Sequence, residues 1–100
     1  MKPYRVRVLR RAEHDLVELR TYLDREAPGS AGHVLDDLLD AIESLARSPQ
    51  RGARPRDERL RSRGFRFLVR RPYLIFFKVT GRRVWVYRVL HGRRPWSRLL

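Results

Sequence analysis

Residues 73–91, YLIFFKVTGRRVWVYRVLH, contain two runs of β-branched and aromatic residues with a short polar segment between them. Such side chains favour strands, so the runs at 73–79 and 84–91 are predicted to be two strands. The segment TGRR between them contains Gly81 and is typical of a hairpin turn. A similar run, FRFLVRR at 65–71, stops at a proline. We therefore predict a three-stranded antiparallel meander in the C-terminal part of the chain.

In the N-terminal half, the spacing between apolar residues changes along the chain from two residues to three or four. YRVRVL at 4–9 alternates apolar and charged side chains, which predicts a first strand. From Ala12 onward the spacing is that of an amphipathic helix, which should end near Pro28. A second helix, capped by Ser30, carries the most regular apolar stripe in the chain and should end before Pro49. The short connection between two apolar stripes predicts an αα-hairpin.

Together these elements predict an α+β fold. Its order is an N-terminal strand, the αα-hairpin and the three-stranded antiparallel meander, with both helices packed on one face of the sheet. A length of 100 residues fits a single domain over 1–100. Residues 50–64 have no usable period and many charges, so they are predicted to form a loop.

Alternation within the strands predicts which side chains face away from the helices, because successive strand residues point to opposite sides. Taking charged residues as markers of the open face, we expect it to hold Arg66, Leu68, Arg70, Leu74, Phe76 and Lys78. The residues expected on the helix side are Phe65, Phe67, Val69, Tyr73, Ile75, Phe77 and Val79. An apolar centre with a basic rim is typical of a partner-binding surface.

The last strand gives a conflicting pattern. Its charged residue, Arg88, favours the outward placement of Val84, Val86 and Leu90. That choice sends Trp85 and Tyr87 inward, where both are bulky, so this assignment is weaker than that of the preceding strand.

The charge of the chain is concentrated at one end. The net charge is +13, yet residues 1–58 hold 11 basic and 11 acidic side chains. Residues 59–100 hold 13 basic side chains and no acid. A field of one sign attracts polyanions or an acidic partner.

The sequence lacks the residues that several classes of function require. The chain has no cysteine, which excludes disulfides, thiol catalysis and cysteine metal sites. The histidines, His14, His33 and His91, lack the spacing of metal ligands, and no phosphate-binding glycine loop is present, so we expect no metal and no cofactor. The acids of the first predicted helix, Asp15 among them, are spaced as a solvated face and not as a catalytic carboxylate pair. No apolar run reaches the roughly 20 residues of a membrane span, and no secretory signal is seen, so a cytoplasmic protein is expected.

The end of the chain, HGRRPW at residues 91–96, places an aromatic side chain among cations. This combination suits the binding of a protein hot spot or of a single-stranded nucleic acid. Two structural alternatives remain open. His91 can be a strand-end histidine that is bonded to the backbone, and Trp96 can dock on the body of the protein with Leu99 and Leu100.

The chain as a whole resembles the RelE/ParE superfamily, the small basic toxins of type II toxin-antitoxin modules that are often called plasmid stabilisation proteins. The resemblance is carried by LRRAEHDLVELRTYL in the first helix, LLDAIESLARSP at the end of the second, and YLIFFKVTGRRVWVYRVLHGRR across the hairpin. It covers nearly the whole chain and implies the same α+β fold.

Resemblance to RelE-type members would imply a ribosome-dependent mRNA interferase, which uses cations to stabilise a phosphate and a C-terminal tyrosine to transfer a proton. The nuclease positions fall on Arg66, Leu68 and Leu74, with the tyrosine near Leu100. Leucine cannot bind a phosphate, and no tyrosine follows Tyr87. The alternative function is therefore an mRNA interferase that relies on Arg66, His91 and Arg94.

Resemblance to ParE-type members implies a toxin that poisons DNA gyrase, blocks replication and has no catalytic residues of its own. This is the favoured hypothesis, in which nucleic acid is involved only indirectly. The expected target-binding residues are Arg88, His91, Arg93, Arg94 and Trp96. The resemblance also implies an acidic, ParD-like antitoxin, expected to bind the residues assigned above to the open face, and a toxin-antitoxin complex that can be a heterotetramer.

Overall fold

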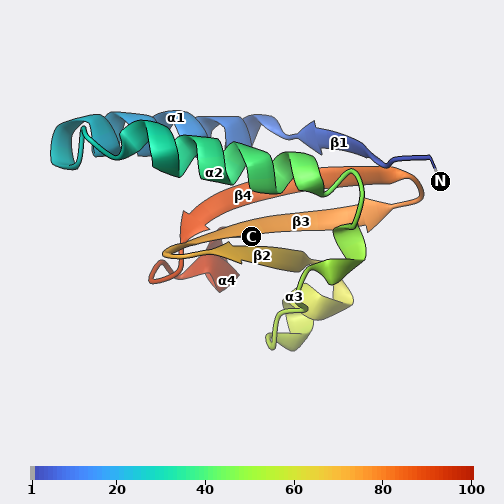
Figure 1. Cartoon of the computed structure of the whole chain (residues 1–100). Coiled ribbons are helices and arrows are strands. Elements are labelled where there is room, and N and C mark those ends of the chain that lie inside the picture. The colour runs from blue at the N-terminus through green and yellow to red at the C-terminus, as the bar shows by residue number, and fades with distance from the viewer. Residues whose placement is uncertain (1) are drawn as a thin grey trace.

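The computed structural model describes residues 2–100 as a four-stranded sheet with two long helices on one face and two short helices on the other (Figure 1). In chain order the elements are β1 (Arg5–Val8), α1 (Arg10–Glu26), α2 (Ala31–Ser44), the 3-10 turn η1 (Pro49–Arg51), α3 (Glu58–Ser62), β2 (Arg66–Arg70), β3 (Tyr73–Thr80), β4 (Arg83–His91) and α4 (Trp96–Leu99). The predicted fold class is confirmed.

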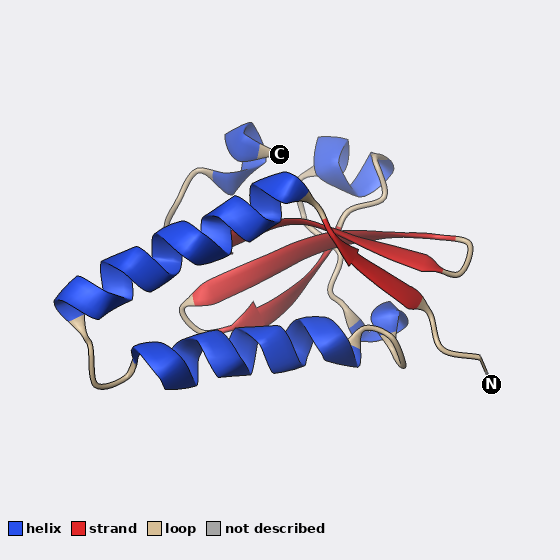
Figure 2. Cartoon of the chain, turned by 90° about the horizontal axis from the view of Figure 1, so that it is seen from above, coloured by secondary structure: helices blue, strands red, loops and turns tan. Residues whose placement is uncertain are grey.

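The sheet has the strand order β1-β4-β3-β2. β2, β3 and β4 form the predicted antiparallel meander, whereas β1 lies parallel to β4 at the edge. Figure 2 shows the two long helices, seen from above, running along this sheet. The first and last strands of the chain are thus neighbours, with Arg5 opposite Arg83 and Arg7 opposite Trp85.

The main core lies between the sheet and the α1-α2 hairpin. It includes Leu38, Ile42 and Leu45 from the end of the hairpin, packed against β3 and β4. The alternation in β3 predicted that four side chains face the helices, and all four lie in this core: Tyr73, Ile75, Phe77 and Val79. Ser30 is the N-cap residue of α2, as expected, but its side chain makes no capping bond, because its hydroxyl donates to the Ala27 carbonyl at 3.2 Å.

A second core lies on the opposite face, beneath α3 and α4. Its buried members are Leu60, Phe65, Phe76 and Leu90, and its partly buried members include Phe67, Leu74, Tyr87, Trp96, Leu99 and Leu100. The expectation of a loop throughout 50–64 was wrong, because α3 forms there with its N-terminus capped by Asp57, whose carboxylate accepts a bond from the Leu60 N–H at 3.2 Å. Five residues are too few to show a helical period in the sequence.

A β-bulge in β4 resolves the conflict in the last strand. Phe77 is opposite Val86 while Phe76 is opposite Arg88, which leaves Tyr87 as an extra residue. One extra residue reverses the alternation beyond it. Val84 and Val86 therefore pack in the main core, so their outward placement was wrong, whereas Leu90 lies in the second core as expected.

The predicted faces of β2 were wrong. Leu68 is opposite Ile75 and is buried in the main core, whereas Phe65 and Phe67 pack in the second core. The two arginines misled the assignment because β2 is a short edge strand, whose ends allow charged side chains to reach polar groups on the helix side. Arg66 donates to the carbonyls of Gln50 and Gly52, and Arg70 lies 3.5 Å from the Asp37 carboxylate on α2.

Within residues 2–100, no helix combines the length and the apolar character that crossing a membrane requires.

Candidate functional site

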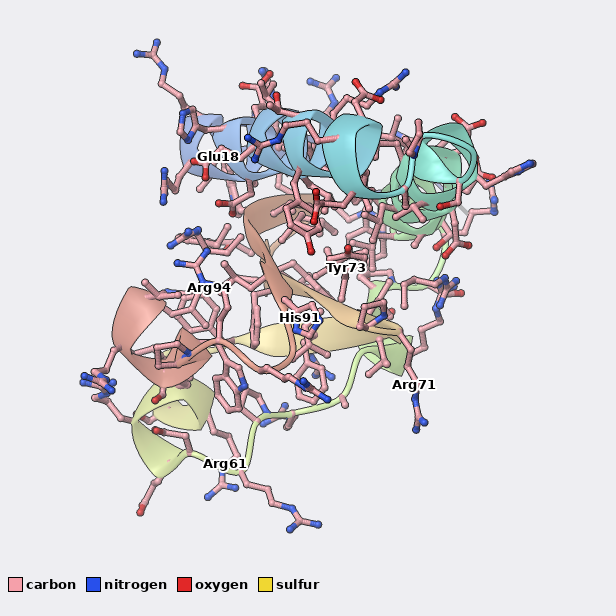
Figure 3. All side chains as sticks on the ribbon, turned by 90° about the vertical axis from the view of Figure 1, so that its left-hand side faces the viewer. Glu18, Arg61, Arg71, Tyr73, His91 and Arg94 are labelled. Carbon is pink, nitrogen blue, oxygen red and sulfur yellow. The ribbon has the colours of Figure 1, made fainter. Side chains whose placement is uncertain are left out.

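A pocket of about 290 Å³ opens between α1 and the C-terminal end of β4. Its lining residues are Asp15, Glu18, Leu19, Tyr22, Tyr73, Val89, Leu90, His91 and Arg94. In Figure 3, Glu18 lies on α1, and Tyr73, His91 and Arg94 lie below it on the side of the sheet. The pocket exists because β1 ends at Val8, so the last residues of β4 have no neighbouring strand on the side away from β3.

Asp15, one of the lining residues, forms a buried ion pair with Arg88 of β4. Arg88 Nε lies 2.8 Å from Asp15 Oδ2, and Arg88 Nη2 lies 3.0 Å from Asp15 Oδ1. The Val89 N–H, beyond the end of β1, also donates to Asp15 Oδ2 at 3.0 Å. The third guanidinium nitrogen of Arg88 donates to the Leu99 carbonyl at 3.1 Å. Each charged atom is bonded, so this pair joins α1, β4 and α4 and has no spare group for catalysis.

His91 and Tyr73 form one wall of the pocket. Their rings meet edge to face, with centroids 5.7 Å apart. The Arg93 N–H donates to His91 Nδ1 at 3.1 Å, which is the backbone-bonded arrangement that the sequence left open. Burial raises the pKa of Tyr73, and the nearby Tyr22 raises it further. Tyr73 is therefore a neutral phenol at neutral pH.

The rim of the pocket is polar. On α1, the Glu18 carboxylate lies 2.6 Å from His14 Nδ1 and 3.8 Å from Arg11. On the opposite side, Arg93 and Arg94 are exposed in the turn that follows β4. The pocket thus has an apolar floor, an acid on one side and cations on the other.

The three residues of the alternative nuclease site do not converge. Arg66 is opposite Phe77, whereas His91 is opposite Tyr73, four residues further along β3. At about 3.3 Å per residue this is a separation of roughly 13 Å along the sheet. Arg66 also points to the helix side, where its guanidinium is bonded to backbone carbonyls. The predicted grouping of Arg66 with His91 and Arg94 is therefore wrong in this structure.

The residues expected on the open face divide between two faces. Leu68 is buried beneath the helices, with Arg66 and Arg70 beside it. Leu74, Phe76 and Lys78 do lie on the opposite side, but Phe76 is fully buried beneath Trp96, with ring centroids 5.4 Å apart. α3 and α4 therefore cover the apolar centre that was expected to be open.

The expected target-binding residues also separate. Arg88 is 6% exposed and is held by Asp15, so its expected place on the surface was wrong. Trp96, Leu99 and Leu100 dock on the second core, as the structural alternative for the tail proposed. His91 and Arg94 remain accessible in the lining of the pocket, and Arg93 is exposed in the turn between them.

Sequence reasoning missed the contributions of Asp15 and Tyr22. Asp15 was assigned to the solvated face, although it is three residues from Ala12 and so falls on the inward side of the helix. That spacing was a usable signal. Tyr22 is 52% exposed and lines the pocket. Within residues 2–100, no cluster of three or more His, Asp or Glu side chains could hold a metal ion.

Two solved structures share this architecture. One is a chromosomal ParDE toxin-antitoxin system from P. aeruginosa, with a TM-score of 0.72 and 23% identity over 88% of this chain and 95% of that one. The other is the toxin-antitoxin complex RelBE2 from Mycobacterium tuberculosis, with a TM-score of 0.66 and 26% identity over 89% of this chain and 98% of that one. The fold is thus that of the toxins in toxin-antitoxin systems.

Sequence comparison identifies the family within this class of proteins. A protein of Sinorhizobium fredii named "Putative toxin Y4kP" is 29% identical over 100 residues, the full length of both chains. Residues 6–96 match the family described as ParE toxin of type II toxin-antitoxin system, parDE. The chain belongs to this ParE toxin family.

Proposed function

We propose that this toxin acts by binding and poisoning DNA gyrase, not by cutting RNA. The observation that carries the proposal is the separation of Arg66 from His91 and Arg94, which denies a phosphate the convergent cations of a nuclease site. General acid-base catalysis requires groups within hydrogen-bond reach of the same reacting atoms. The gyrase target is the one that resemblance to ParE-type toxins implies.

His91, Arg93 and Arg94 are the residues we propose for contact with the target. His91 and Arg94 line the pocket, and Arg93 lies between them in the turn after β4, where a large partner can reach all three. Arg88 supports them indirectly, because it anchors β4 to α1 and α4.

An acidic antitoxin is the proposed inhibitor. The two similar solved structures are toxin-antitoxin systems, and the surplus of 13 basic residues in 59–100 favours a partner of opposite charge. We place an apolar anchor of that partner in the pocket, against Leu19, Tyr22 and Val89, with a carboxylate of the same segment near Arg94. Such an antitoxin would cover His91 and Arg94 and so block the target surface.

A supercoiling assay with purified DNA gyrase tests the proposal. The isolated toxin should inhibit supercoiling or trap cleaved DNA, and the Arg93→Ala/Arg94→Ala variant should lose this effect while its circular dichroism spectrum stays unchanged. Arg20→Ala/Arg25→Ala removes the same charge from the exposed side of α1 and should remain fully active. Undisturbed supercoiling together with ribosome-dependent mRNA cleavage that His91→Ala abolishes would overturn the proposal in favour of an mRNA interferase.

A further inference from the structure

The fold separates the charges of this chain by layer. The acids in α1 and α2 are Glu13, Asp15, Glu18, Asp24, Glu26, Asp36, Asp37, Asp40 and Glu43, nine of the eleven in the chain. All of these except Asp15 are exposed. The opposite face of the sheet is covered by α3 and α4 over its apolar part only. The remaining part of that face carries basic residues.

Parallel pairing of β1 with β4 builds this basic area. It brings Arg5 beside Arg83 and Arg7 beside Trp85, and both β1 arginines are exposed. From the other side, β3 places Lys78 opposite Trp85. Side chains at paired positions share a face, so Trp85 is flanked by a cation on each neighbouring strand. At about 4.8 Å per strand, the row from Arg7 to Lys78 is roughly 10 Å wide.

Aromatic rings hold several of these cations in place. Lys78 Nζ lies 4.5 Å from the Phe65 ring centroid and 5.0 Å from that of Tyr87. The Arg83 guanidinium lies 5.9 Å from the Trp85 centroid. These separations are within the range of cation-π attraction. Tyr87 lies two residues beyond Trp85 in β4, so its ring lies on the same face of the sheet.

No carboxylate neutralises this area. Within residues 2–100, Arg5, Arg7, Lys78 and Arg83 form no ion pair. Burial lowers the pKa of Lys78, and the nearby Arg63 lowers it further. An anion bound beside these cations would relieve their mutual repulsion.

We propose that a cationic-aromatic face, made of Arg5, Arg7, Lys78, Arg83, Trp85 and Tyr87, binds single-stranded nucleic acid. Cations in adjacent strands can follow successive phosphates, and the half-buried ring of Trp85, with Tyr87 beside it in β4, offers a surface on which an unpaired base can stack. A purely acidic protein would use the cations and leave the rings without a role. This face is distinct from the pocket at the other end of β4, so the inference does not depend on gyrase.

Fluorescence anisotropy with labelled oligothymidylate of about 20 nucleotides measures the binding across a series of salt concentrations. Arg5→Gln/Arg7→Gln should weaken binding about tenfold or more and reduce the slope of log K against log salt by about 1.4. The matched control, Arg20→Gln/Arg25→Gln, removes the same charge from α1 and should change the affinity much less. Equal losses in the two variants would show binding by net charge alone and would overturn the proposal.

Trp85 itself provides a second readout. In a Trp96→Phe background Trp85 is the remaining tryptophan, and its fluorescence should be quenched as oligothymidylate is added. Trp85→Ala keeps every charge and should lose the preference for a single strand over a duplex of equal length. Unquenched Trp85, or a duplex bound as tightly as the single strand in the parent protein, would contradict the proposal, as would tighter binding of polyglutamate than of oligothymidylate. An oligouridylate arm shows whether DNA or RNA is preferred, and preference for either fits the proposed face.

Discussion

Asp15 on α1 and Arg88 on β4 form a two-point ion pair that is almost completely buried, with side chains 5% and 7% exposed. The same carboxylate accepts the Val89 N–H, and the same guanidinium donates to the Leu99 carbonyl. One pair of residues therefore joins the first helix, the last strand and the C-terminal helix.

Asp15→Ala should destabilise the fold by about 3 kcal/mol or more, because it leaves the Arg88 guanidinium buried without its carboxylate. Urea unfolding followed by circular dichroism measures the change. Glu18→Gln, one turn away on the exposed side, is the control and should shift the free energy of unfolding by less than about 0.5 kcal/mol. The explanation is wrong if the double variant Asp15→Ala/Arg88→Met is as unstable as Asp15→Ala, since removing both charges should recover part of the loss.

Gly52→Ala should destabilise the protein by about 1–3 kcal/mol through overpacking. A Cβ at Gly52 would stand close to the Phe77 ring, which is fully buried in the main core and cannot move away. Gly32→Ala, in the first turn of α2, meets no atom within 4 Å and should be neutral or stabilise by roughly 0.5 kcal/mol. Thermal unfolding measures the change in stability of each variant. A neutral Gly52→Ala would refute the close packing of Gly52 against the Phe77 ring.

Trp96→Ala should cost about 2–3 kcal/mol, since it uncovers Phe76 and loosens the second core. The variant should also bind a hydrophobic dye that the parent protein does not bind. Trp96→Phe retains an aromatic ring over Phe76 and should lose much less stability. An unchanged melting temperature in Trp96→Ala would mean that α4 does not protect this face.

The raised pKa of Tyr73 predicts that the folded protein loses stability at alkaline pH. Its pKa is raised in the folded state, so the unfolded chain releases the phenolic proton first, at a pH of about 10. The contribution of the neutral phenol is fully present below this pH and is lost as pH rises above it. Urea unfolding of the parent protein and of Tyr73→Phe at pH about 9 and about 11 tests the sign. The parent should lose stability relative to Tyr73→Phe, and a gain in the parent would disprove the assignment.

Local patterns in the sequence were sufficient for the four strands and the two long helices, but not for the short helix α3. The period of two in 73–79 and the apolar stripe of the second helix have counterparts in β3 and α2. The alternation failed in β2 and β4 for two physical reasons. Arginines at the ends of an edge strand reach polar groups on the helix side, and a one-residue bulge at Tyr87 has no marker in the sequence.

The candidate site was less predictable because it depends on strand order. Nothing in YRVRVL indicates that this strand lies beside the last one, so the end of β4 could not be recognised as an unpaired edge over a pocket. His91, Arg93 and Arg94 were proposed from the pattern HGRRPW and from the family resemblance, and the structure leaves them accessible. Arg88 was chosen by the same reasoning, and its burial follows from a carboxylate 73 positions away.

The parallel pairing of β1 with β4 also determines when the protein can complete its fold. Arg5 to Val8 pair with Arg83 to Val86, so β1 has no place in the sheet until residues 83–86 have been synthesised. Closing a loop of this length costs entropy before any pairing is gained. During synthesis β1 therefore stays unpaired until β4 has been made. The cationic-aromatic face needs both strands, so it is absent from any nascent chain that ends before β4.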